Sequence, residues 1–455
     1  MDLPSAASPT SSVTTPINSR GSLAELAEMD QQGVNRLLDK FFIGIHGKNP
    51  ILDEASARRM VRRAFIEGID WSPGSCLALI ICALGCLATP FGPSHDVGPG
   101  TQAYADSQVF FQAAQKRIGI LLAQSDIIGA QCLFLSGVYM MSIFQPIFAW
   151  RFFSQALAAC QHIPFLRRAQ NLSSTSDFSP ESMEMGRRDT QEQAVYWSAW
   201  KSERELRKEL SLPDFENQYT GNSLYPPFFP TPPQPSIESP GAPDPQDQRA
   251  RAAWLFYLAE ISLRRLNSRL CSEIYTLRQN NPRVSRFLEV LAEMIPEYEM
   301  QAKEWAASLP AELSIHSMDD EDICRSVLRG HLANLFEIMY WPFVVVGLDS
   351  LVSGQQMSLA TQEMLARALE NHVSRLHANE PGFLHRHHGA LFMIKSCTRS
   401  ALVLVAAANL GVTMPRGWSE VVYKVIAMLS YWAGEVAALG NWKSLLDREM
   451  AKATS

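Results

Sequence analysis

Apolar residues recur at three- and four-residue spacing along most of this chain, and that periodicity limits the folds open to it. Within 192–210, for example, Val195, Ala199 and Leu206 share one face of a helix. Strands would need apolar and polar residues in alternation between turn pairs, and such segments are nearly absent. The sequence therefore predicts an all-α fold, a large array of antiparallel helices. Later helices are expected near 325–348, 357–377, 388–411 and 418–447.

Three biased segments interrupt the helical pattern. Residues 1–30 are rich in Ser, Thr and Pro and predict a disordered start. Residues 167–188 predict a loop between helices. Residues 225–248 hold nine of the 27 prolines and predict an extended connector, because proline disrupts helices. The connector divides the helices into two expected halves, residues 31–224 and 249–450.

Two uncharged segments raise the question of a membrane. Residues 76–89 are too few to span a bilayer, whereas residues 127–150 reach spanning length without a charged side chain. The longer segment contains Gln131, Gln145 and Pro146 and lies between amphipathic helices. We therefore predict a buried helical hairpin there and no membrane.

The balance of charge argues against autonomous binding to DNA. The chain has 40 Lys and Arg against 46 Asp and Glu, a net charge of −6. Proteins that bind nucleic acid alone usually present a basic face to the phosphates. The eight cysteines form no CxxC pair and mostly have apolar neighbours, so we expect reduced, buried thiols of an intracellular protein.

Sequence motifs of enzymes are almost entirely missing. No P-loop, GxGxxG, HExxH or GxSxG pattern occurs. Ser198 and Lys201 match the SxxK spacing of acyl-transfer enzymes, but the partner motifs are absent and we attribute the match to chance. The acidic run 318–322 lacks the DDxxD spacing and predicts a solvated loop or a helix N-terminus. We therefore expect a protein that is not an enzyme and has no catalytic residue.

Histidines and arginines form two further polar clusters. His385, His387 and His388 could supply metal ligands, but a site needs three or four ligands, so a polar loop or helix start is favoured and no metal is predicted. Four arginines share one helical face and could bind phosphate or contribute to nuclear import. Pairing with Asp53, Glu54 or Glu67 is the favoured interpretation. The arginines are Arg58, Arg59, Arg62 and Arg63.

Aromatic side chains offer two other candidate sites. In the charged amphipathic helix 192–210, core packing of Trp197 and Trp200 is favoured over binding to a membrane or partner, and Glu203 and Arg207 form an i, i+4 pair. Other aromatic residues could line an apolar ligand pocket, although ordinary core packing is favoured for each. They are Phe41, Phe42, Phe110, Phe111, Tyr139, Phe144, Trp150 and Phe152.

Six segments in sequence order resemble the fungal-specific transcription factor domain, the middle homology region of fungal regulators that usually carry a binuclear zinc cluster. The first segment contains two aromatic residues, a histidine, a proline and an aliphatic-aliphatic-acid end. The resemblance covers about 35–447. Its segments are Leu37–Asp53, Leu77–Ala88, Tyr104–His162, Tyr196–Pro213 with the prolines at 226–233, Trp305–Pro310 and Tyr340–Phe343.

This resemblance implies an all-helical regulatory domain in the nucleus that controls transcription. It also implies that dimers are common and that the regulated genes are often metabolic. Two features depart from the family. Its Arg-Pro-Phe motif is Trp341-Pro342-Phe343 here, so an ion pair of that arginine is missing. The CxxC pairs of the zinc cluster are also missing, since the first cysteine is Cys76. Zinc ligands and DNA-contacting lysines therefore have no counterpart, and no cofactor is implied.

Three functions remain open at this point. The favoured one is a non-enzymatic regulator of metabolic or secondary-metabolite genes. It would reach DNA only indirectly or through a missing N-terminal cluster, as a homodimer or as a heterodimer with a zinc-cluster relative. The second is a sensor of a small apolar effector, which is compatible with the first. The third is an all-α enzyme on apolar substrates, which acids or histidines converging in the largest cavity would favour. Cofactor-binding residues are not identified.

Overall fold

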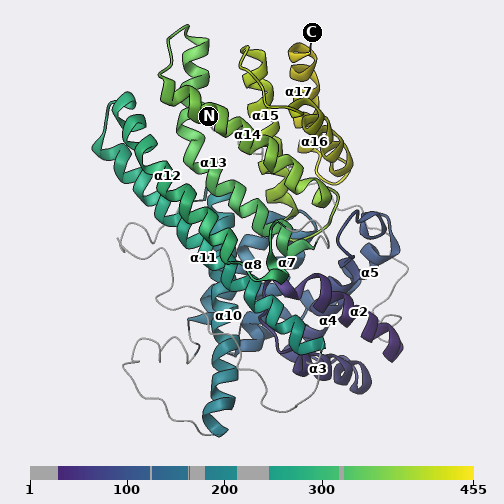
Figure 1. Ribbon diagram of the computed structural model, residues 1–455. Coiled ribbons are helices and arrows are strands. Elements are labelled where there is room, and N and C mark those ends of the chain that lie inside the picture. Colours follow the sequence, from purple (N-terminus) through teal and green to yellow (C-terminus); the bar gives the residue numbers. More distant parts are fainter. Residues whose placement is uncertain are drawn as a thin grey trace.

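The computed structural model describes residues 29–122, 126–161, 163, 180–212, 245–316 and 322–454, and within 180–189 it describes the backbone alone. These residues form fifteen α-helices and four short 3₁₀ turns, with no strand among them, and the predicted all-α fold is confirmed (Figure 1). The α-helices are α2 (Gln31–Gly44), α3 (Glu54–Glu67), α4 (Pro73–Leu87), α5 (Gln102–Gln115), α6 (Ile118–Leu121), α7 (Ile127–Ser142), α8 (Pro146–Cys160), α10 (Pro180–Glu209), α11 (Pro245–Asn280), α12 (Val284–Ser308), α13 (Ile323–Val352), α14 (Leu359–Asn379), α15 (Ala390–Asn409), α16 (Trp418–Trp432) and α17 (Ala438–Ala453). The 3₁₀ turns are η1 (His46–Lys48), η2 (His95–Val97), η3 (Ala311–Leu313) and η4 (Glu380–Gly382).

Short polar side chains define where many of these helices begin. Asp53, for example, accepts a hydrogen bond from the Ser56 backbone N–H at 2.8 Å, which satisfies one of the free donors of the first turn of α3. Asp322 does the same for α13 through the N–H of Arg325. The last residue of the acidic run 318–322 is therefore a helix cap, as predicted, and the other four lie outside the described residues.

Helices α4 and α7 form the centre of the first segment, which we define as residues 31–212. Every residue of α4 from Ser75 to Leu87 is buried, and so is every residue of α7 from Gly129 to Ser142. A helix that is apolar on all sides is stable only when other helices surround it. Helices α2, α3, α5 and α7 pack around α4, while α8 and α10 cover α7.

The second segment, residues 245–454, packs onto the first through a shared core. One cluster of buried apolar side chains extends from Val34 in α2 to Met450 in α17. Figure 1 shows α13 to α17 together in the upper part of the molecule, and α11 running from them down to the first segment. The division into two halves stays a prediction, but the apolar core is continuous across it.

Arg386, in the loop before α15, links the two segments. Its side chain is 2% exposed and donates to the Ser142 carbonyl at the end of α7 at 2.9 Å. The same guanidinium contacts the carboxylate of Glu435 and lies over the Trp432 ring at 5.3 Å. Glu435 lies in the break between α16 and α17, so the single helix expected over 418–447 is wrong. Gly434, a poor helix former, and this buried ion pair account for the break.

Two helices begin earlier than the biased segments predict. Pro180 starts α10 inside the expected loop 167–188, and Pro245 starts α11 inside the expected connector 225–248. Proline fits the first helical turn because its missing N–H would have no partner there. Residues 164–179 and 213–244 lie outside the described part of the chain, as do residues 1–28 of the expected disordered start.

The predicted hairpin is confirmed: α7 and α8 cover residues 127–150, with a break at Phe144 where φ is +56°. Two other described helices, α13 and α15, are long and apolar enough to cross a membrane, a test that core helices also pass. Helix α15 packs against α13, α14, α16 and α17. All eight cysteines are free thiols, as predicted, and six are buried.

Glu337 of α13 holds the three central helices of the second segment together. It accepts from Arg375 of α14 at 2.5 Å and from Arg399 of α15 at 2.6 Å. Burial alone would raise the pKa of Glu337, but the two arginines lower it to about 2. Arg375 is 1% exposed, so this is an ion pair of the protein interior.

Helix packing predicts a strong effect of one added methyl group. A Cβ atom on Gly85 of α4 would lie 2.5 Å from the Leu37 carbonyl oxygen of α2, so Gly85→Ala must push the two backbones apart. We expect the unfolding free energy to fall by about 1–3 kcal/mol in urea titration. The control is Gly440→Ala in α17, where the added Cβ meets no atom within 4 Å and stability should be equal or up to about 1 kcal/mol higher. Equal losses in both variants would contradict the close approach of α2 and α4.

The Glu337 ion pairs predict a pH effect on stability. Because the folded pKa of about 2 lies below the ordinary value, this carboxylate stabilises the fold above about pH 4.5 and stops doing so as pH falls toward 2. Glu337→Gln should cost about 3 kcal/mol at pH 7, and its difference from the wild type should narrow as pH falls toward 2. Exposed Glu363→Gln is the control and should change stability by less than about 0.5 kcal/mol. A pH-independent difference would contradict this account.

Candidate functional site

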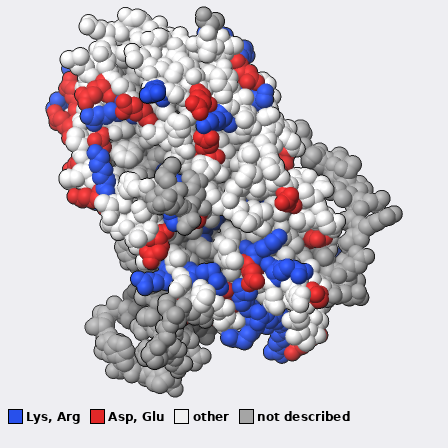
Figure 2. Space-filling view, turned by 45° about the vertical axis from the view of Figure 1, so that its right-hand side comes forward, with Lys and Arg blue, Asp and Glu red and all other residues white. Residues whose placement is uncertain are grey.

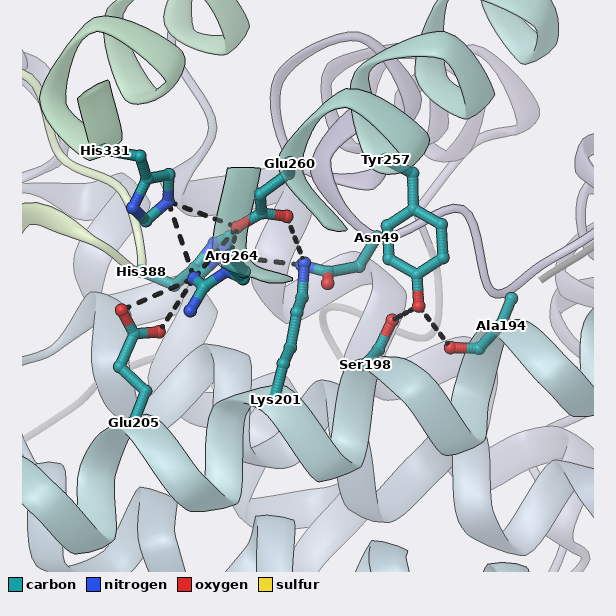
Figure 3. A network of polar contacts seen from close by, with 10 residues as sticks. All are labelled: Asn49, Ala194, Ser198, Lys201, Glu205, Tyr257, Glu260, Arg264, His331 and His388. Atoms are coloured by element: carbon teal, nitrogen blue, oxygen red, sulfur yellow. Dashed lines mark hydrogen bonds and ion pairs between the residues drawn. The ribbon is translucent and has the colours of Figure 1, made fainter. Parts of the chain in front are cut away.

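The candidate site is a pocket of about 120 Å³ between the two segments, which we call the Lys48 pocket. The first segment contributes Lys48 from η1 and Lys201 from α10 to its lining. The second segment contributes Glu260 from α11, His331 from α13 and His388 from the loop before α15. Figure 3 shows how most of these side chains converge from separate helices.

Glu260 is the centre of the polar contacts around this pocket. Its carboxylate is 4% exposed and accepts from Lys201 at 2.5 Å, from Arg264 at 2.9 Å and from His331 at 3.2 Å. We call these four residues the Glu260 network. Burial alone would raise the pKa of Glu260, but Lys201, Arg264 and His331 lower it well below its usual value. The carboxylate is therefore charged at neutral pH and joins α10, α11 and α13.

A hydroxyl chain extends the same interface by one helical turn. The Tyr257 hydroxyl donates to the Ala194 carbonyl at 3.0 Å, so the Ser198 hydroxyl, 3.0 Å away, donates to Tyr257 (Figure 3). Ser198 and Lys201, the predicted SxxK match, thus each bond to a different residue of α11. Both side chains join α10 to α11, which agrees with the interpretation of the motif as chance.

Lys48 is brought to the pocket by the turn that follows α2. His46 accepts from the Leu52 N–H at 3.1 Å and packs against the ring of Phe42 at 5.0 Å. Burial lowers the pKa of His46 to about 4, so this acceptor is a neutral imidazole. The backbone between His46 and Leu52 is thereby folded over the end of α2, and the Lys48 side chain enters the protein.

The Lys48 ammonium group is the feature of the pocket that needs most explanation. The residue is 3% exposed, and its Nζ has no hydrogen-bond partner among the described residues. Burial lowers the pKa of Lys48 to about 8, while the negative charge of Glu260 opposes that shift. The group is therefore mostly charged at pH 7, and a buried charge without a partner is costly.

The three histidines lie in the loop before α15, as predicted, but their side chains are buried. His385 is 3% and His387 5% exposed, and their rings stack at 5.6 Å. His388 lies with its Nε2 3.5 Å from the Asn49 amide nitrogen. Burial and the nearby charge of Lys48 lower the pKa of His387 and of His388 well below the usual value, so both rings are neutral at pH 7. Among the described residues, no three His, Cys, Asp or Glu side chains are placed to hold a metal ion.

The aromatic residues considered for a ligand pocket do not line this one. Phe41, Phe110 and Tyr139 are core residues, and Phe111 stacks on Tyr139 at 4.0 Å. Trp197, 1% exposed, packs edge-on to Trp200 at 5.7 Å, which confirms core packing for the first of them. The favoured interpretation is thus confirmed for these aromatics. The Lys48 pocket has instead a lining rich in charged and imidazole groups.

Two of the four clustered arginines form ion pairs, with Glu54 and Glu67 among the predicted partners, while Arg59 and Arg62 donate to Ser56 and Asn35. Arg58 is buried between Asp39 and Glu54, each at 2.8 Å, and Arg63 pairs with Glu67 at 2.8 Å. The four do not share one environment, because Arg58 is 7% exposed while Arg59 and Arg63 lie on the surface. The expected Glu203–Arg207 pair is also present, with a 2.9 Å contact.

Sequence reasoning named Lys201, His387 and His388 for other reasons but missed Lys48, Glu260, Arg264 and His331. Glu260 and Arg264 occupy the buried side of α11, at the i, i+4 spacing of an ion pair, and that spacing was a usable signal. Lys48 has no comparable signal, because the charged residues that face it across the pocket, Lys201 and Glu260, are more than 150 residues away in sequence. Acids and histidines do converge here, which is the pattern that would favour an enzyme. In this pocket Lys201, Arg264 and His331 keep Glu260 charged, and His387 and His388 are neutral at pH 7.

The unpaired ammonium predicts opposite effects for two lysines of the pocket. Lys48→Met removes a buried charge without a partner and should raise the unfolding free energy by roughly 1–3 kcal/mol at pH 7. Lys201→Met strips Glu260 of its closest cation and should lower it by about 3 kcal/mol. Burial lowers the pKa of Lys48 to about 8, so the buried charge destabilises the fold fully below pH 8. This destabilisation disappears as pH rises toward 10.5, the ordinary pKa of lysine.

Urea titrations at pH 7 and pH 9.5 measure both effects. The advantage of Lys48→Met should be smaller at pH 9.5. A Lys48→Met variant as unstable as Lys201→Met would mean that Lys48 has an ion partner in the folded protein.

Comparison with known proteins identifies one part of the chain. Residues 38–212 match the family model of the fungal specific transcription factor domain. The match runs from α2 to the end of α10, and the predicted resemblance is confirmed for this stretch. Its extension to 447 stays a prediction. Neither the curated proteins nor the solved structures gave a match.

Proposed function

We propose that this chain, whose residues 38–212 are a fungal specific transcription factor domain, regulates transcription as a non-enzymatic helical body. The family match carries the proposal, because this domain belongs to fungal transcription factors. The buried contacts of Glu260 and Arg386 support it further. They tie the matched domain to the helices that follow it.

The proposal includes a place of action and a class of target. The protein would act in the nucleus on metabolic or secondary-metabolite genes. The protein would contact DNA through a zinc cluster, either its own or that of a zinc-cluster relative. It would act as a homodimer in the first case and as a heterodimer with that relative in the second. The net charge of −6 supports this arrangement, because a protein that binds DNA alone usually has a surplus of basic residues. Figure 2 shows basic side chains gathered toward the lower end of one face with acidic side chains among them, and Arg63 is paired with Glu67.

A tethering experiment tests the regulatory role. The chain is fused to a heterologous DNA-binding domain in a fungal host, with a reporter gene downstream of the matching sites. We expect the fusion to raise or lower reporter transcription at least about threefold relative to the DNA-binding domain alone. Fluorescence of a tagged copy reports whether the fusion enters the nucleus.

The matched control is the fusion carrying Gly85→Ala together with Lys201→Met, which weakens the folded body without changing its surface. It should lose the effect on the reporter. A wild-type fusion that occupies the promoter, as measured by chromatin immunoprecipitation, and leaves transcription unchanged would contradict the proposal. Sedimentation velocity of the purified chain, alone and with a zinc-cluster relative, tests the proposed dimer. A monomer in both samples would contradict both the homodimer and the heterodimer.

A further inference from the structure

Three buried polar atoms next to the Lys48 pocket have no hydrogen-bond partner among the described residues. They are Lys48 Nζ, His388 Nδ1 and Asn49 Oδ1. Buried polar groups in folded proteins almost always have partners, because an unpaired group loses its hydration without compensation. Three such atoms in one place indicate that the complete site includes a further polar group.

Charge balance indicates the sign of that group. Of the three cations in the lining, Arg264 contacts both Glu260 and Glu205, and Lys201 contacts Glu260. Those two carboxylates balance these two cations, and Lys48 remains as one surplus positive charge. The neutral histidines add none. The pocket therefore presents a net positive charge inside the protein, where charge interactions are stronger than in water.

The tautomer of His388 adds a second donor. The Asn49 amide nitrogen can only donate, so His388 Nε2, 3.5 Å away, accepts, and the ring proton lies on Nδ1. His388 Nδ1–H and the Lys48 ammonium are then two donors without acceptors. A carboxylate offers two acceptor oxygens and one negative charge, which matches both requirements.

We propose that the Lys48 pocket binds a small organic carboxylate, held by an ion pair with Lys48 and a hydrogen bond from His388. A volume of about 120 Å³ limits the ligand to a short acid. This ligand differs from the apolar effector considered from the sequence, because the lining supplies charge and donors.

The position of the pocket gives the ligand a regulatory role, and this part of the inference rests on the proposed function. Lys48 and Lys201 belong to the matched domain, whereas Glu260, His331 and His388 lie outside it. A ligand that contacts Lys48 and His388 at once stabilises the packing of the two segments. Such a ligand would shift the protein toward this packed arrangement to the extent that it binds it more tightly than any arrangement in which Lys48 and His388 are apart.

Thermal unfolding of the purified chain tests binding directly. Malonate, acetate and inorganic phosphate are titrated at pH 7 with ionic strength held constant. We expect malonate or acetate to raise Tm by about 2–4 °C with saturation. Lys48→Met should fold but lose the shift, and Lys40→Met, at an exposed lysine of α2, should keep it.

Each other result overturns the proposal. The absence of a saturable Tm shift with either carboxylate would contradict carboxylate binding. An equal Tm shift in Lys48→Met would show that the carboxylate does not bind at Lys48. A shift with phosphate alone would overturn the assignment to a carboxylate.

The pH dependence of the malonate shift is a second readout. The groups that face Lys48 are Cys324, Glu260, Lys201 and the three histidines at 385, 387 and 388. Binding should be constant from pH 6.5 to 7.5 and weaken at higher pH as the ammonium loses its proton. A shift that persists unchanged at pH 10.5 would exclude Lys48 as the anchor.

The reporter fusion separates this inference from the proposed function. A reporter effect without malonate binding would support the regulatory role and contradict the proposed carboxylate site. Malonate binding without a reporter effect would keep the ligand and contradict the regulatory role.

Discussion

A carboxylate buried at the junction of two helical segments constrains how this protein is assembled. Glu260 stays charged only while Lys201, Arg264 and His331 surround it, and these come from three different helices. Apolar packing alone would allow α10 and α11 to slide or rotate against each other, because it has little directionality. The ion pair and the Ser198–Tyr257 chain fix one register between them. The pocket beside Lys48 exists because that register holds its walls in place.

Much of the fold could be predicted from the sequence because helical periodicity is a local signal. The spacing of Val195, Ala199 and Leu206 identified a buried helix face correctly. Local signals failed where a tertiary contact decided the outcome. The chain near Gly434 looks helical, yet the ion pair between Arg386 and Glu435, 49 residues apart, lies at the break. Proline was also misread, since Pro180 and Pro245 begin helices in places where composition predicted loops.

The candidate site was much harder to predict, for the same physical reason. Lys48, Glu260 and His388 meet from positions more than a hundred residues apart, and each alone is an ordinary polar residue. The histidines were noticed in the sequence, but their burial and neutral state depend on the helices that enclose them. The aromatic residues that attracted attention as pocket walls proved to be core. The family resemblance came from a different kind of signal, the order of several weak segments along the chain, and the family match confirms it over residues 38–212.

The continuous core also constrains how such a protein can evolve by recombination. The family match ends near residue 212, but the buried side chains that complete its surface come from α11, α13 and the loop before α15. If recombination replaced the second segment with that of a relative, Lys201 would face a different α11, and Arg386 would be lost from Ser142. The two segments must therefore be inherited as a matched pair. Exchange between relatives is restricted to positions outside this shared interior.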